Sequence, residues 1–245
     1  KLSAYLSLNK LQLNVSKTKY IVFAPPNKPR NYSSTVLFEG KEIKQVTSQK
    51  LLGVWFSEGL TWNTHIEKLT VELSKTIGCL YKLSPVLPKW LQIELYYALF
   101  YSKMTYGILV WGTTTQTNYQ KLLVLQKRVS RAFEQYHGII RDLKTKPLFE
   151  KYALLTITKL YHFKLLQWIK QNKPQCLQNP LDNTHYTMRQ QRRKIPAIRT
   201  SYGKQHIQYQ IPTMLNCLHG LIDFNSVPSN TIIKSILMKH DIEYA

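Results

Sequence analysis

Short apolar runs separated by turn residues mark the first sixty residues of the chain, a pattern typical of mixed α/β structure. Residues 2–13 have the spacing of an amphipathic helix, and the β-branched and aromatic residues at 19–24 predict a strand. Further strands are expected at 35–38 and 42–46, joined as a hairpin around Gly40, and at 51–56. Together these segments predict a small sheet of three or four antiparallel strands.

After Trp62 the apolar positions take on a helical period. One stripe predicts a helix that ends before Pro85, and it consists of Ile66, Leu69, Leu73, Ile77 and Leu80. A second, aromatic-rich helix is expected over 89–106. A third is expected over 118–136, with its inward positions at Leu122, Leu125, Val129, Phe133 and Tyr136. The fold class predicted is therefore α+β, with a small antiparallel sheet followed by a mainly α-helical region.

Two weaker helical patterns follow. Pro147 suits the first turn of a fourth helix that continues to residue 172, because proline is tolerated where no backbone donor is needed. This segment is apolar on most sides, so it is expected to be buried. A short helix is expected at 231–239 near the end of the chain.

Cations lie opposite the apolar stripe on the first and third of these helices. Lys68, Lys75 and Lys82 recur every seven residues. The third helix carries Lys121, Lys127, Arg128 and Arg131. A solvated helix surface explains either face equally well on its own. Two such faces with few balancing acids favour a surface that meets phosphates.

The segment 183–222 contains no acidic residue. Its cations are Arg189, Arg192, Arg193, Lys194, Arg199 and Lys204, and Tyr186, Tyr202 and Tyr209 are interleaved with them. Cations can meet phosphates and rings can stack on bases, so this composition is typical of a nucleic-acid contact. A basic loop tied to the core by its tyrosines is the alternative, and both interpretations stay open.

The overall charge supports a polyanionic partner. The 245 residues include 34 Lys and Arg but 13 Asp and Glu, which gives a formal net charge of +21. With 44% hydrophobic and 12% aromatic residues, the chain is expected to fold around a core rather than form a basic tail. No stretch approaches the ~20 apolar residues of a membrane helix, so no membrane partner is predicted. Cys79, Cys176 and Cys217 have no metal-binding spacing, which favours a reducing compartment.

The residues alone predict no catalytic centre. A polymerase or nuclease site needs clustered carboxylates to hold two divalent metals, whereas the aspartates are isolated from one another: Asp142, Asp182, Asp223 and Asp241. Phosphate-binding glycine loops, zinc-protease motifs and nucleophile motifs do not occur, and the seven histidines are scattered. We therefore expect no metal site, no cofactor and no small-molecule substrate for this chain.

The order of several motifs resembles non-LTR (LINE-type) retrotransposon reverse transcriptases. Leu13, Asn14, Lys17 and Thr18 match that family's "LN..KT" segment, and residues 51–55 and 60–66 match its "FLGV…L.W..HI" block with Leu51 in place of Phe. Residues 97–112 match a "Y…YG…Wg" block, and residues 122–131 match "L..lQkra.R". Residues 199–203 and 216–218 look like the region beyond the thumb. Each block is weak alone, but together they follow the family's order over nearly the whole chain.

The resemblance implies a role for each part. Residues 1–60 would be the end of the polymerase palm, with a hairpin at Leu52, Gly53 and Val54 similar to the primer grip. Residues 61–145 would be the helical thumb, and 146–245 a basic C-terminal extension. Lys17 matches a lysine suggested to protonate departing pyrophosphate in the family; the alternative is an ordinary surface lysine before a strand. Mg²⁺ would serve the intact parent polymerase.

The family's catalytic aspartates would lie upstream of Lys1, which itself falls within a helical pattern, so we expect that an upstream part is missing, as in a 5′-truncated copy. The leading hypothesis is a fragment of an RNA-directed DNA polymerase that is not itself an enzyme but binds RNA template and DNA primer. It would be intracellular, in a nuclear or cytoplasmic ribonucleoprotein. The alternatives are a stand-alone basic RNA- or DNA-binding or scaffolding module without polymerase ancestry, and a relic with no biochemical role.

Overall fold

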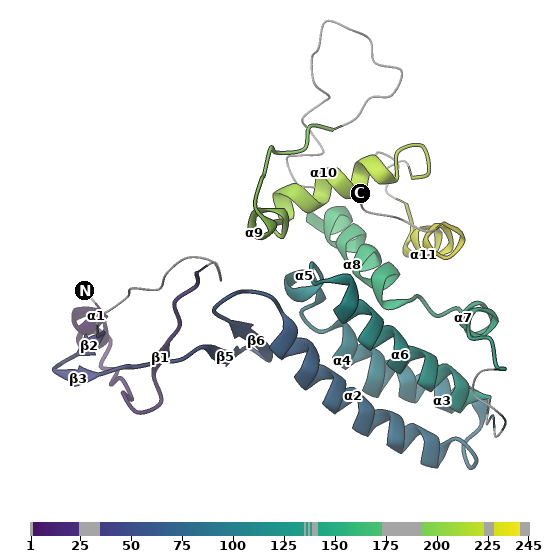
Figure 1. Cartoon of the computed structure of the whole chain (residues 1–245), viewed down its shortest axis with the longest axis horizontal. Helices are drawn as coiled ribbons and strands as arrows, with labels where there is room; N and C mark the ends of the chain where they lie inside the picture. Colours follow the sequence, from purple (N-terminus) through teal and green to yellow (C-terminus); the bar gives the residue numbers. More distant parts are fainter. Residues whose placement is uncertain are drawn as a thin grey trace, which may run out of the picture. The chain divides into compact units, whose positions relative to one another are not determined.

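In a computed structural model, residues 2–24, 35–134, 136, 138, 142–172, 193–222 and 228–240 are described. The chain forms two compact units, Lys1–Lys68 and Leu69–Ala245 (Figure 1). The fold is α+β and mainly helical, as the sequence predicts, and its strands pair two by two. The expected division near residues 60 and 145 stays a prediction.

The first unit begins with helix α1 (Leu2–Leu8) and contains the strands. β2 (Leu37–Phe38) and β3 (Lys41–Glu42) form one antiparallel hairpin, and β5 (Ser48–Leu51) and β6 (Val54–Ser57) form another. β1 (Lys19–Tyr20) pairs in parallel with β4 (Lys44–Gln45), so the expected all-antiparallel sheet is wrong at this pair. A parallel pairing needs a long connection, which local sequence pattern does not reveal.

Both hairpins turn through two residues with positive φ. The values are 50° and 77° at Glu39 and Gly40, and 45° and 87° at Leu52 and Gly53. Positive φ at both central positions is the geometry of a type I′ turn, which matches the twist of paired strands. The prediction of one strand over 51–56 is therefore wrong, because the chain reverses at Leu52 and Gly53.

Helices make up the second unit. α2 (Asn63–Leu83) begins in the first unit and continues into the second. The expected helix over 89–106 is α3 (Lys89–Leu95), the π-helical segment η1 (Tyr96–Tyr101) and α4 (Ser102–Thr105). The remaining helices are α5 (Ile108–Trp111), α6 (Gln116–Phe133), α7 (Lys146–Lys151), α8 (Ile157–Asn172), α9 (Ser201–Lys204), α10 (Ile207–Cys217) and α11 (Asn230–Lys239).

The two apolar stripes predicted for α2 and α6 are confirmed. All five stripe positions of α2 are buried, and so are Leu122, Leu125, Val129 and Phe133 of α6, while Tyr136 is half-buried. Phe133 meets Tyr96 edge-on at 5.8 Å between ring centroids, and Tyr96 stacks on Phe100 at 5.4 Å. The core of the second unit therefore joins α6 to the aromatic segment η1.

The prediction of one continuous fourth helix is wrong, because the segment forms two helices with a break between them. α7 ends at Lys151, Ala153 has a φ of 48°, and α8 begins at Ile157. Buried Gln126 of α6 holds the break: its Nε2 donates to the Leu155 carbonyl at 3.0 Å, and its Oε1 accepts from the Ile157 N–H at 2.7 Å. The side chain thus supplies partners for backbone groups that a continuous helix would have paired internally.

The basic segment after residue 192 is also more ordered than a loop. α9 and α10 lie within it, and Ile211, Met214 and Leu215 of α10 are buried. Tyr202 and Tyr209 are half-buried, whereas Tyr186 lies outside the described residues. The short helix expected at 231–239 is confirmed as α11.

Candidate nucleic-acid interface

The lysines that recur along α2 are all exposed. Lys68, in the first unit, places its Nζ 5.8 Å from the centre of the Trp55 ring, a cation–π distance. Lys75 and Lys82, in the second unit, form no ion pair with any described residue. The C-terminal half of α2, from Leu73 to Leu83, contains no acid, so the charges of Lys75 and Lys82 are not balanced along this part of the helix.

The cations of α6 divide into two kinds. Lys121 and Arg128 are exposed, whereas Lys127 and Arg131 are half-buried. The Nε of Arg131 is buried and has no hydrogen-bond partner within the described part of the chain. No acidic residue occurs in the 18 residues of α6. The exposed pair is therefore the better candidate for contact with a polyanion.

A side-chain contact brings the C-terminal halves of α2 and α6 together. The Tyr81 hydroxyl donates to the Arg128 carbonyl at 3.1 Å, and the Ser84 hydroxyl donates to the Ala132 carbonyl at 2.5 Å. Lys82 and Arg128 consequently lie at the same end of the helical unit. This end brings together cations from two helices that the sequence pattern treats separately.

Exposed aromatic rings lie at the same end. The buried amide of Gln92 donates to the carbonyls of Ser84 and Leu87 at 2.8 and 2.7 Å, which fixes the start of α3 against the turn after α2. Trp90, in the first turn of α3, is 66% exposed, and Tyr81 is 43% exposed. We call Tyr81, Lys82, Lys89, Trp90 and Arg128 the α2–α3 corner. Trp90 and Tyr81 were not expected as site residues from the sequence. The adjacent cation and aromatic ring of Lys89 and Trp90, directly after Pro88, are the local pattern that could have indicated them.

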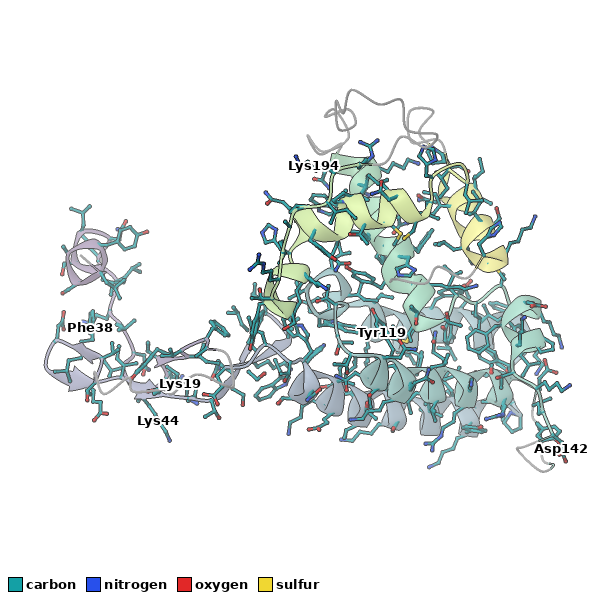
Figure 2. All side chains as sticks on the ribbon, turned by 45° about the horizontal axis from the view of Figure 1, so that its top comes forward. Lys19, Phe38, Lys44, Tyr119, Asp142 and Lys194 are labelled. Atoms are coloured by element: carbon teal, nitrogen blue, oxygen red, sulfur yellow. The ribbon has the colours of Figure 1, made fainter. Side chains whose placement is uncertain are left out.

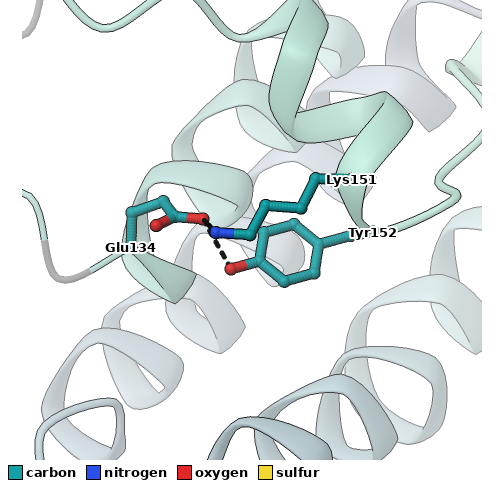
Figure 3. Close-up of polar contacts among 3 residues, drawn as sticks. All are labelled: Glu134, Lys151 and Tyr152. Atoms are coloured by element: carbon teal, nitrogen blue, oxygen red, sulfur yellow. Dashed lines mark hydrogen bonds and ion pairs between the residues drawn. The ribbon is translucent and has the colours of Figure 1, made fainter.

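The acid that directly follows α6 is already engaged. Glu134, just after α6, accepts hydrogen bonds from Lys151 at 2.7 Å and from Tyr152 at 2.6 Å (Figure 3). The hydrogen bond from Lys151 is the main cause, and the hydrogen bond from Tyr152 the second, of a pKa for Glu134 below its usual value. The carboxylate therefore ties α6 to the end of α7, and its charge is offset by Lys151.

The cations expected in the C-terminal extension are described only in part. Arg193 is half-buried, and its backbone N–H and carbonyl both bond the side chain of Asn216 in α10, at 2.7 and 2.8 Å. Lys194 is exposed and is labelled in Figure 2. Arg189 and Arg192 lie outside the described residues.

The positions expected from the polymerase resemblance occupy separate environments in the first unit. Lys17 is exposed in a turn, where its N–H donates to the Asn14 side chain at 3.2 Å. Leu52 is 83% exposed at the tip of the β5–β6 hairpin, whereas Val54 is 5% exposed. The segment expected to resemble the primer grip does form a hairpin, but Leu52 and Gly53 are its turn, whereas Val54 begins β6 and is buried.

Metal ligands do not cluster in the described part of the chain, where no group of three or more His, Cys, Asp or Glu side chains could hold an ion. None of the described helices combines the length and the apolarity needed to cross a bilayer. Comparison with known proteins found no matching family model, no matching curated protein and no matching solved structure.

Proposed function

We propose that this chain binds nucleic acid without sequence preference, as the template- and primer-binding remainder of a LINE-type reverse transcriptase. The observation that supports it best is the hydrogen bond from Tyr81 to Arg128, which joins two acid-free helix segments beside an exposed tryptophan. Cations attract the phosphates, and an exposed ring offers a stacking surface for an unpaired base. The order of the sequence motifs is what supports the polymerase family in particular.

The test is a binding measurement with two charge-matched variants. One replaces the three cations of the corner, Lys82, Lys89 and Arg128, with Gln, all exposed and free of ion pairs with described residues. The control replaces Lys144, Lys146 and Lys239, which are also exposed but lie elsewhere in the sequence. Affinity for single-stranded RNA, duplex DNA and an RNA–DNA hybrid is measured by fluorescence anisotropy for the parent and both variants.

The first variant is expected to weaken binding to all three ligands about equally, and more than the control does. Equal losses would mean that net charge alone attracts the ligand. Unchanged affinity in the first variant, with the fold intact by circular dichroism, would mean that these cations merely solvate helix surfaces.

The aromatic part of the corner is tested at Trp90. Base stacking on an aromatic side chain contributes about 1–3 kcal/mol per base. Trp90→Ala should therefore lower the affinity for single-stranded RNA by roughly tenfold or more, and the affinity for duplex DNA by much less. Trp90→Phe keeps a ring and should retain most of the affinity. Equal losses for single and double strands would contradict a stacking role.

The proposed remainder lacks the paired carboxylates that hold two metals, so we expect no template-directed nucleotide incorporation by the purified chain, with or without Mg²⁺. Incorporation above background would overturn this part of the proposal. Sequence upstream of Lys1 in the genome is the most direct test of ancestry: a reading frame with an Asp-Asp strand motif would support it, and an unrelated domain would favour a stand-alone binding module.

A further inference from the structure

A cavity of about 610 Å³ lies within the second unit, away from the residues of the α2–α3 corner. Its walls come from the connection between α5 and α6, from the first half of α8, and from α9 and α10, which converge in Figure 1. Tyr119, labelled in Figure 2, belongs to its lining. Cavities of this size take small ligands up to the size of a mononucleotide.

A chain of contacts fixes the walls. A methyl group on Gly112 would stand 2.3 Å from the Tyr161 ring, so the ring packs directly on the glycine backbone. The Tyr161 hydroxyl donates to the Gln210 side chain at 3.2 Å, and the amide of Gln210 donates to the Lys204 carbonyl at 2.6 Å. The Tyr119 hydroxyl donates to the Gly112 carbonyl. These contacts involve α6, α8, α9 and α10, so the lining is joined before any ligand binds.

The polar groups of the lining suit an acceptor-only, negatively charged ligand. No carboxylate lines the cavity. Lys204 contributes a cation, and the Thr113 hydroxyl is buried without a partner among the described residues. The Thr114 hydroxyl accepts from Asn118 at 2.8 Å, which leaves its own proton to donate. Phosphate oxygens accept several such donors at once, whereas an amine or a metal cation would need acceptors.

Two further features agree with an anion. α6 and α10 both begin beside the cavity, through Gln116 and Tyr209, and neither has an acid in its first turn. Helix N-termini carry partial positive charge. His162, also in the lining, adds no charge to the cavity at pH 7, because burial in the first place, and Lys159 in the second, lower its pKa to about 4.

We infer that this cavity binds the phosphate group of a nucleotide, through Lys204 and the hydroxyls of Thr113 and Thr114. The half-buried phenol of Tyr209 and the ring of Tyr161 lie in the same lining and offer aromatic surface to the base. The nucleotide could come free in solution or as one unit of a strand, because both present the same phosphate.

The full chain is titrated with adenosine 5′-monophosphate and, separately, with adenosine, using isothermal calorimetry. The monophosphate is expected to bind, and adenosine is expected to bind at least tenfold more weakly, because the phosphate supplies the charged hydrogen bonds. Lys204→Gln and Thr113→Val should each lower the affinity for the monophosphate several-fold. Lys194→Gln, an exposed cation outside the lining, is the matched control and should change nothing.

Equal affinity for adenosine and its monophosphate, or no binding of the monophosphate at about 10 mM, would overturn the inference. So would a monophosphate affinity that neither Lys204→Gln nor Thr113→Val reduces while both variants stay folded. A 5′-phosphorylated trinucleotide distinguishes the sources: a loss on Lys204→Gln assigns the site to a strand, and an unchanged affinity assigns it to the free nucleotide.

The outcome is separable from the proposed corner. Replacement of Lys82, Lys89 and Arg128 should leave the affinity for the monophosphate unchanged, because none of the three lines the cavity. A loss equal to that of Lys204→Gln would place the phosphate at the corner and overturn the cavity site.

Discussion

At the scale of the residue, the backbone conformation of a glycine decides whether its replacement by alanine raises or lowers stability. Gly53 has a φ of 87° at the tip of the β5–β6 hairpin, whereas Gly78 lies in α2 with open space where a Cβ would be. A Cβ in the left-handed region costs roughly 1–2 kcal/mol, and alanine in a helix gains about 0.5–1 kcal/mol over glycine. We therefore expect Gly53→Ala to lower the free energy of unfolding and Gly78→Ala to raise it, as measured by urea denaturation. A gain at Gly53 would contradict the turn geometry.

At the same scale, His162 makes stability depend on pH. Its folded pKa is lowered to about 4, first by burial and then by Lys159, while an unfolded histidine titrates near 6.5. Between these values the unfolded chain binds a proton that the folded chain does not, so stability falls as the pH falls from about 6.5 to about 4. The loss attributable to His162 is about 3 kcal/mol over that window.

This prediction is checked by urea unfolding at several pH values between 4 and 7. His162→Gln should flatten the dependence in that range, whereas His240→Gln, at an exposed position, should leave the slope as in the parent. Glu134 acts in a different window, because its lowered pKa removes stability at more acidic pH. Parallel slopes for the parent and His162→Gln would contradict the role of burial.

At the scale of elements, periodic patterns predict structure well and breaks poorly. The stripes of α2 and α6 are readable because five and four apolar positions repeat with the period of the helix. The break between α7 and α8 is not readable, because buried Leu154 and Leu155 continue the apolar run and the partner that stabilises the break is Gln126, far away in the sequence. The parallel pairing of β1 with β4 could not be predicted for the same reason, because the two strands are far apart in the sequence.

The break yields a specific test. Gln126→Leu removes the partner of the Leu155 carbonyl and of the Ile157 N–H, both in a buried setting. An unsatisfied buried backbone group costs about 1–3 kcal/mol, so we expect a loss of roughly 2–5 kcal/mol in unfolding free energy. Gln120→Leu, at an exposed position of the same helix, is the control and should be nearly neutral in the same urea titration. A similar effect of both variants would mean that Gln126 does not hold the break.

At the scale of the whole molecule, charge was predictable and its arrangement was not. The net charge of +21 can be counted from the sequence, and it is the ground for proposing a polyanionic partner. The junction of Lys82 with Arg128 depends on Tyr81 and Ser84, whose contacts span 47 and 48 residues. The cavity was hidden further, because its lining carries one lysine and otherwise neutral side chains from segments far apart in the sequence.

The first unit exposes several large apolar side chains. α1 has no buried residue, and Leu2, Tyr5 and Leu8 are 55%, 60% and 84% exposed. A palm fragment without its central strands is expected to leave Tyr20, Val22, Trp55 or their neighbours exposed. These three are half-buried, whereas Phe23, next to Val22, is 50% exposed. The apolar surface of this unit therefore includes α1, the hairpin tip at Leu52, and exposed Leu11, Phe23 and Leu37. Hydrophobic surface of this kind favours self-association.

The salt dependence of nucleic-acid binding tests how the whole charge is used. If about six cations meet phosphates, affinity for duplex DNA should fall about 10³-fold between 50 and 200 mM salt, because each contact releases a counterion. Replacing Lys82, Lys89 and Arg128 with Gln should reduce the slope of log K against log salt by about 2–3, since each lost contact removes just under one unit. Replacing Lys144, Lys146 and Lys239 should leave the slope near that of the parent, because none of the three belongs to the α2–α3 corner. Equal slopes for both triple variants would mean that the ligand senses the summed field of the protein and makes no defined contact at the α2–α3 corner.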